Sequence, residues 1–89
     1  MEETTYRSFY RKTPPFLTRY ERAKVLAVRA EQLSIGQLPR VEVPDGNMSH
    51  LDIAWQELRL KTIPNCIVRT LPSGATEVWA VKDLINLYD

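Results

Sequence analysis

The sequence contains few of the residues that build disulfides and metal sites. Its 89 residues include a single cysteine, Cys66, and a single histidine, His50. One cysteine cannot form a disulfide within the chain, and these two residues cannot supply the four ligands of a structural zinc site. We therefore expect no metal or other cofactor, and a reducing compartment as the simplest environment.

Long hydrophobic runs are also missing. No stretch approaches the roughly 18 apolar residues of a membrane-spanning helix. The first residues, Met1-Glu2-Glu3, are acidic, and no apolar segment of a secretory signal follows them. These features predict a soluble, intracellular protein.

The usual signatures of catalysis are absent too. The sequence has no glycine-rich phosphate loop and no CxxC or HExxH spacing. Cys66 lies in an apolar run typical of a buried, inert thiol, and His50 follows a serine at a predicted helix start. Asp52 and Glu57 are five residues apart on a helix and so do not face each other. We find no catalytic residue and expect that the isolated chain is not an enzyme.

Charge is unevenly distributed along the chain. Residues 1–29 contain seven Lys or Arg and three Glu, whereas residues 30–89 contain five basic and eight acidic residues. The first third is thus about +4 and the remainder about −3. Such asymmetry suits an acidic protein surface or nucleic acid, or it reflects a solvated helix face and a basic tail.

The sequence divides into an arm and a domain. Residues 1–17 predict an extended or disordered N-terminal arm, in which aromatic and basic residues alternate before Pro14-Pro15. This mixture could stack on bases or lie on a protein surface. Residues 18–89 are expected to fold as one small domain, near the size at which a partner is commonly needed for stability.

The first predicted helix starts at a capping box. Thr18 is suited to the N-cap position and Glu21 to N3, and Gly36 is a natural stop. Arg22 and Arg29, seven residues apart, flank an apolar stripe, where they either clamp acceptors at the rim of a docked surface or cover the edge of the stripe. The stripe itself is rich in small residues: Tyr20, Ala23, Leu26, Ala27, Ala30, Leu33 and Ser34.

A second helix is predicted from about Ser49 to Lys61, with Ser49 as its N-cap. One stripe consists of Leu51, Ala54, Trp55 and Leu58, while Ile53 and Leu60 lie on nearly the opposite side. A helix that is apolar on two sides in so small a chain has more to bury than its own domain covers. This pattern predicts a protein partner.

The C-terminal part predicts a β-hairpin. Residues 65–70 and 76–81 are expected to be strands on either side of a turn at 71–74, and residues 83–85 either one helical turn or an extended end. An extended piece is also expected at 40–43, before the turn residues 44–47. The fold class is therefore α+β, with two main helices, a C-terminal hairpin and an extended arm.

The segment LTRYERAKVLAVRAEQLSIG resembles the signature helix of a small shared subunit of cellular RNA polymerases. This family comprises bacterial omega, archaeal subunit K and the common sixth subunit of eukaryotic nuclear polymerases. The matching positions in this helix are Thr18, Tyr20, Glu21, Arg22, Ala23, Val25, Arg29, Ala30 and Gln32. Later positions match in order and spacing as well: Ile53-Ala54, Glu57-Leu58, Ile63-Pro64, Arg69, Leu71-Pro72, Gly74 and the segment 79–85.

The resemblance implies a non-catalytic core subunit of a DNA-directed RNA polymerase. Members of this family clamp segments of the largest subunit and so support assembly and stability of the complex during transcription. Catalysis would stay with the large subunits, and DNA and RNA would be contacted only indirectly. The protein would be nuclear in a eukaryote, and cytoplasmic in an archaeal or viral setting.

Twelve residues are predicted to bind partner subunits. They are Tyr20, Arg22, Ala23, Leu26, Arg29, Ala30, Leu33, Ile53, Trp55, Leu60, Arg69 and Trp79. Two other functions remain open: a free-standing nucleic-acid-binding module, suggested by the basic aromatic arm, and a regulator that docks on polymerase reversibly.

Overall fold

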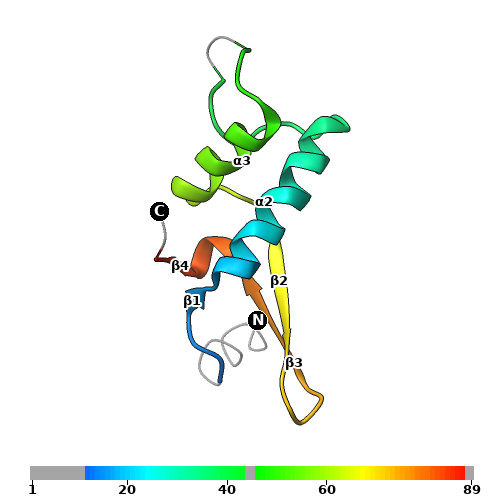
Figure 1. Cartoon of the computed structure of the whole chain (residues 1–89), viewed down its shortest axis with the longest axis vertical. Coiled ribbons are helices and arrows are strands. Elements are labelled where there is room, and N and C mark those ends of the chain that lie inside the picture. Colours follow the sequence, from blue (N-terminus) through cyan, green and yellow to red (C-terminus); the bar gives the residue numbers. More distant parts are fainter. Residues whose placement is uncertain (1–11, 44–45, 88–89) are drawn as a thin grey trace, which may run out of the picture.

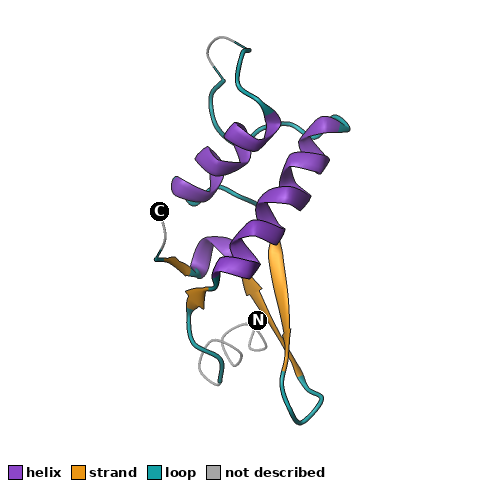
Figure 2. Cartoon of the chain, viewed as in Figure 1, coloured by secondary structure: helices purple, strands orange, loops and turns teal. Residues whose placement is uncertain are grey.

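The structure is a computed structural model that describes residues 12–43 and 46–87. It contains two helices, a β-hairpin and a second, very short strand pair (Figures 1 and 2). The α+β class with two main helices and a C-terminal hairpin is confirmed. Residues 1–11 of the predicted arm, and Pro44 and Asp45 of the predicted turn, lie outside the described residues.

Helix α2 (Arg19–Ser34) begins at the predicted capping box. The Glu21 backbone N–H donates to Thr18 Oγ1 at 3.0 Å, and the Thr18 N–H donates to Glu21 Oε1 at 3.0 Å. Two amide groups that a helix start leaves unpaired are thereby satisfied. The helix ends at Ile35, and Gly36 follows at φ 110°, a conformation that glycine adopts without steric cost.

Helix α3 (His50–Arg59) starts as predicted, with Ser49 at the N-cap. The Asp52 N–H donates to Ser49 Oγ at 3.1 Å. The segment before it, where an extended piece was predicted, forms no strand at residues 40–43 in the described part of the chain. That extended piece has no neighbouring strand to pair with.

The strands of the fold form two separate pairs. Strands β2 (Cys66–Thr70) and β3 (Thr76–Ala80) form the predicted antiparallel hairpin, which extends away from the helices (Figure 2). Strands β1 (Phe16–Leu17) and β4 (Ile85–Asn86) pair in parallel. The 3₁₀ turn η1 (Val81–Asp83) joins β3 to β4, so the C-terminal segment contains both a helical turn and an extended end.

The core combines residues of β1, both helices, β3 and η1 with Ile63 and Leu84 from the connecting segments. Leu17, which the sequence assigned to the arm, is fully buried in it. The backbone from Lys12 onward already contacts the hairpin, and the Ile85 N–H donates to the Pro15 carbonyl at 2.8 Å. The clustered core residues are Leu17, Val25, Leu26, Ala54, Leu58, Ile63, Trp79, Val81 and Leu84.

Candidate protein-interaction surface

A buried ion pair joins the two helices. Arg29 on α2 and Glu57 on α3 are 1% and 0% exposed. Arg29 Nε donates to Glu57 Oε1 at 2.6 Å, and Arg29 Nη2 donates to Glu57 Oε2 at 3.0 Å. This bidentate geometry is the strongest arrangement for an arginine and a carboxylate.

The loop between the helices completes the hydrogen bonding of this pair. Arg29 Nη1 donates to Gln37 Oε1 at 2.8 Å, and Nη2 donates to the Leu38 carbonyl at 3.1 Å. The Arg40 N–H donates to Glu57 Oε2 at 2.7 Å. The Arg29–Glu57 pair therefore fixes both the angle between the helices and the path of the loop that joins them.

Arg29 is buried, although the sequence suggested a place at the rim of a docked surface or along the edge of the apolar stripe. Its guanidinium is turned inward because Glu57 occupies the buried face of α3. Glu57 was missed as a structural residue, although the sequence carries a signal for it. It follows Ile53 and Ala54 by four and three residues, so it shares their face of the helix.

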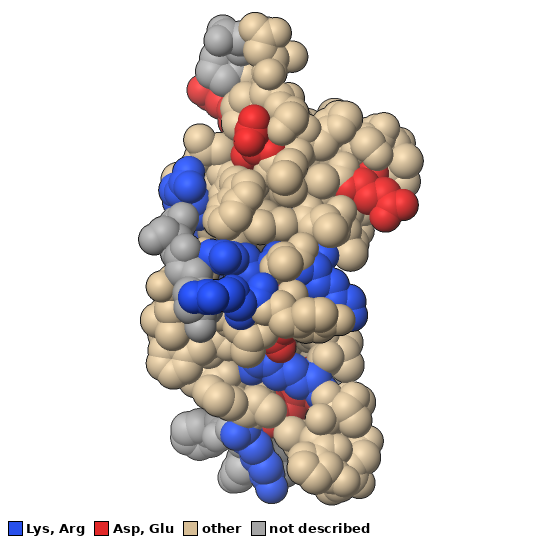
Figure 3. Space-filling view, viewed as in Figure 1, with Lys and Arg blue, Asp and Glu red and all other residues tan. Residues whose placement is uncertain are grey.

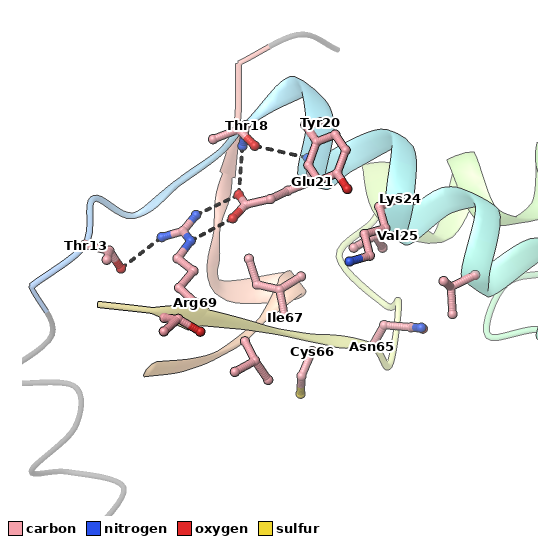
Figure 4. A pocket seen from close by; sticks show the side chains of 13 residues that line it. Thr13, Thr18, Tyr20, Glu21, Lys24, Val25, Asn65, Cys66, Ile67 and Arg69 are labelled. Carbon is pink, nitrogen blue, oxygen red and sulfur yellow. Dashed lines mark hydrogen bonds and ion pairs between the residues drawn. The ribbon is translucent and has the colours of Figure 1, made fainter. Parts of the chain in front are cut away.

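A second arginine holds the N-terminal segment against the hairpin (Figure 4). Arg69 on β2 donates to both carboxylate oxygens of Glu21, at 2.9 and 2.8 Å. Its remaining N–H groups reach Thr13 Oγ1 at 3.1 Å and the carbonyls of Pro14 and Phe16 at 2.6 and 2.8 Å. This arginine thus connects β2, the start of α2 and the strand before it.

Hydrogen bonding lowers the pKa of two carboxyl groups in this region. The Arg69 side chain, with Thr18, lowers the pKa of Glu21 to about 2, and its pKa would otherwise be 4.5. The pKa of Glu77 also falls to about 2, because the Lys12 N–H and the Thr13 hydroxyl donate to it. Both groups are therefore ionised throughout the physiological range.

Five of the twelve predicted partner-binding side chains are enclosed by the chain itself. Burial conflicts with a surface role for them because neighbouring helices and strands already cover them. They are Leu26, Arg29, Leu33, Ile53 and Trp79. The error for α2 arises from its alanines, which do not distinguish the core side of a helix from its solvent side.

The other seven predicted residues lie wholly or partly at the surface. Arg22 and Trp55 come together, with the guanidinium carbon 5.1 Å from the ring centroid, so they link α2 to α3. Ala30 and Arg69 are partly buried, as are Arg22 and Trp55. Tyr20, Ala23 and Leu60 are exposed. A partner role for these seven stays a prediction.

Large apolar side chains are exposed on both helices and on the hairpin. Tyr20 is 74% exposed, Leu60 60% and Val68 64%. Exposed apolar surface spread over several elements of a small chain is typical of a subunit that packs against other chains. Others that the twelve predicted residues omitted are Phe16, Val28, Ile35, Leu38, Leu51, Ile85 and Leu87.

A groove of about 680 Å³ runs between α2 and β2 (Figure 4). Tyr20, Lys24, Val25 and Val28 form its helical side, and residues 65–70 form the other side. The groove brings together a sheet edge and a helix face that no sequence pattern connects.

Basic side chains gather on one face of the molecule. Figure 3 shows Lys and Arg in a band across its middle, over the N-terminal part of α2 and the C-terminal end of α3. Asp and Glu lie mainly above this band in the same view. A band of one charge next to exposed apolar residues favours an acidic partner surface.

Residues 12–43 and 46–87 contain no group of three or more His, Cys, Asp or Glu that is placed to hold a metal ion. No helix in that part is both long and apolar enough to cross a membrane.

The sequence of residues 11–64 matches the family model of RNA polymerase Rpb6. The chain belongs to the RNA polymerase Rpb6 family. The matched region contains both helices and therefore both residues of the buried ion pair. The family resemblance inferred from the sequence is confirmed.

Several curated relatives carry polymerase names. The chain is 47% identical over 74 residues to the Dictyostelium discoideum protein "DNA-directed RNA polymerases I, II, and III subunit rpabc2", covering 83% of this chain and 55% of that one. It is 45% identical over 75 residues to "DNA-directed RNA polymerases II and V subunit 6B" of Arabidopsis thaliana, covering 84% and 51%. Identity to the Saccharomyces cerevisiae subunit RPABC2 is 44% over 75 residues, covering 84% and 48%. The chain thus spans about half the length of the relatives it matches.

Proposed function

We propose that this chain is a non-catalytic core subunit of a DNA-directed RNA polymerase. Membership of the Rpb6 family carries the proposal, and the relatives named above are polymerase subunits. The catalytic centre would lie in other subunits of the complex. In a eukaryotic cell the site of this function is the nucleus.

The partner would be the largest subunit, two segments of which this chain holds together. Exposed apolar side chains on α2, α3 and the hairpin support contact with more than one segment. Joining segments that are distant in a long chain raises their effective concentration and offsets the entropy of loop closure. The Arg29–Glu57 pair supports this role by keeping the two helices at a fixed angle.

Affinity purification of the tagged full-length chain tests the proposal. The two largest polymerase subunits should be recovered with it in equal amounts and should remain after a high-salt wash. Recovery that disappears in the wash would indicate a reversible regulator instead. Failure to recover any polymerase subunit would overturn the proposal.

A free-standing nucleic-acid-binding function is the second candidate, favoured by the basic band (Figure 3). It predicts that the isolated chain binds DNA or RNA with an affinity that falls steeply as salt rises. The subunit function predicts little binding by the isolated chain. Titration of a labelled single-stranded oligonucleotide at two salt concentrations separates the two.

A further inference from the structure

Strand β2 has one paired edge and one free edge within the described part of the chain. The Leu71 N–H donates to the Ala75 carbonyl, and the Val81 N–H donates to the Asn65 carbonyl. Backbone groups alternate along an antiparallel strand, so the odd-numbered residues of β2 face β3. Cys66, Val68 and Thr70 therefore direct their N–H and C=O groups toward the opposite edge.

That free edge opens into the groove beside α2 (Figure 4). Six consecutive residues, 65–70, line the groove, although alternate side chains of a strand point to opposite faces. Only an edge can expose consecutive residues in this way. Val68 and Val28 add exposed apolar surface on the two sides, at 64% and 41% exposure.

The edge lacks the devices that usually block strand addition. Residues Cys66–Thr70 contain no proline or glycine, and the register with β3 continues without a bulge. The one charged side chain of the strand, Arg69, lines the groove but is held in an ion pair with Glu21. An unprotected edge of this kind is a template for pairing with another extended chain.

Lys24 gives the groove a positive charge. Its ammonium lies 5.9 Å from the centroid of the Tyr20 ring, and no carboxylate of the described residues forms an ion pair with it. Glu21 also lines the groove, but Arg69 binds both its oxygens. The groove therefore favours an occupant with a carboxylate near Lys24.

We propose that the free edge of β2 accepts an extended segment of another polymerase subunit as a third strand. Its backbone would pair with Cys66, Val68 and Thr70, its apolar side chains would contact Val28 and Val68, and a carboxylate would meet Lys24. This strand-addition site rests on the proposed function and specifies one surface through which it acts. Main-chain pairing supplies affinity in such recognition, and the side chains supply specificity.

Charge argues against two other occupants. The residues of this chain that directly precede the described part, 4–11, include Arg7 and Arg11 and no carboxylate. A second copy of β2 would bring Arg69 and no carboxylate. Each would add a positive charge beside Lys24.

The thiol of Cys66 tests the site without any substitution. Cys66 is exposed on the free edge, contrary to the burial predicted from its apolar run, and it is the only cysteine in the chain. Maleimide labelling of its peptide, followed by mass spectrometry, should be at least about tenfold slower in the purified polymerase than in the free full-length chain. Equal labelling rates in a stoichiometric complex would overturn the site and leave the proposed function intact.

Zero-length carbodiimide cross-linking identifies the occupant. An amide should form between Lys24 Nζ and an Asp or Glu of another polymerase subunit, with loss of water. A cross-link from Lys24 to Glu2 or Glu3 of the same chain would overturn the proposal. A cross-link between an isotope-labelled and an unlabelled copy would overturn it in favour of a dimer.

A charge reversal provides a matched pair of variants. Lys24→Glu should lower recovery of the polymerase about fivefold, whereas Lys82→Glu, an exposed position that does not line the groove, should leave it unchanged. Equal melting temperatures of the two free variants establish that both fold. Equal recovery of polymerase by both would contradict the site.

Discussion

The two arginine–glutamate pairs of this fold use the same chemistry in different surroundings. Arg29 and Glu57 are enclosed between the helices and meet loop groups from Gln37 to Arg40. The side chains of Arg69 and Glu21 remain 12% and 20% exposed, at the junction of α2, β2 and the N-terminal segment. The difference between the pairs is their burial. Neither member of the Arg29–Glu57 pair can be removed without leaving a buried charge, whereas water can partly solvate Arg69 or Glu21 if its partner is lost.

The comparison assigns the pairs different roles. A buried charge without a partner keeps nearly its full desolvation cost. Loss of either member of the Arg29–Glu57 pair should therefore disrupt the packing of the two helices. The outer pair is accessible to protons and water, and it therefore tunes how firmly the N-terminal segment is held. The predictions below test this division, beginning with the largest expected effect.

Glu57→Gln should have the largest effect because it leaves the Arg29 charge buried without a counter-charge. We expect a loss of about 3–5 kcal/mol in the free energy of unfolding. That loss is a large part of the total stability of a domain this small. Urea unfolding of the purified chain, followed by far-ultraviolet circular dichroism, measures it.

The control is the double variant Arg29→Leu with Glu57→Leu. Removing both charges should restore much of the stability, because two apolar side chains of similar volume need no hydrogen-bond partners. The loss in the free energy of unfolding could instead equal the sum of the losses in Arg29→Leu and Glu57→Leu alone. In that case burial of an unpaired charge would not be the cause.

Arg69→Met should cost less, about 1.5–3 kcal/mol, because water can solvate Glu21 once the arginine is gone. The loss should also be local. Hydrogen exchange of the Ile85 amide, which donates to Pro15, should become faster, while amides in the middle of α3 keep their protection. Uniformly faster exchange in both places would contradict a local role.

Acid should weaken the outer pair gradually, and this is the smallest effect. The pKa of Glu21 is about 2 in the folded chain and 4.5 without its partners, so the stabilisation is complete above pH 4.5. It should be lost as pH falls from 4.5 towards 2. Glu77 titrates over the same range, so Glu21→Gln should reduce the slope of stability against pH without abolishing it.

Urea midpoints measured at several pH values between 2 and 6 check this prediction. An unchanged slope in Glu21→Gln would show that Arg69 does not lower the pKa of Glu21.

Local signals in the sequence predicted the start of both helices and the position of the hairpin. Thr18, Ser49 and the turn at 71–74 act through neighbours within a few residues, so their effect can be recognised without the fold. The family was recognised in the same way, from the order and spacing of short motifs. The structure confirms these elements, and the match to RNA polymerase Rpb6 confirms the family.

Long-range contacts could not be predicted in this way. Whether Arg29 points inward depends on Glu57, a residue on another helix, and the alanines of α2 that extended the predicted apolar stripe, Ala23 and Ala27, lie on its solvent side. Strands β1 and β4 have two residues each, too few for any periodicity. The groove beside β2 depends on the packing of a helix against a strand edge, which no single segment specifies.

The parallel pairing of β1 with β4 has a consequence for synthesis of the protein. Phe16 and Leu17 leave the ribosome long before Ile85 and Asn86 are made, so β1 has no strand to pair with during most of translation. Leu17 can be enclosed only when the last strand has emerged. Chains that terminate before β4 therefore lack the strand that pairs with β1, and this end of the fold stays incomplete in them.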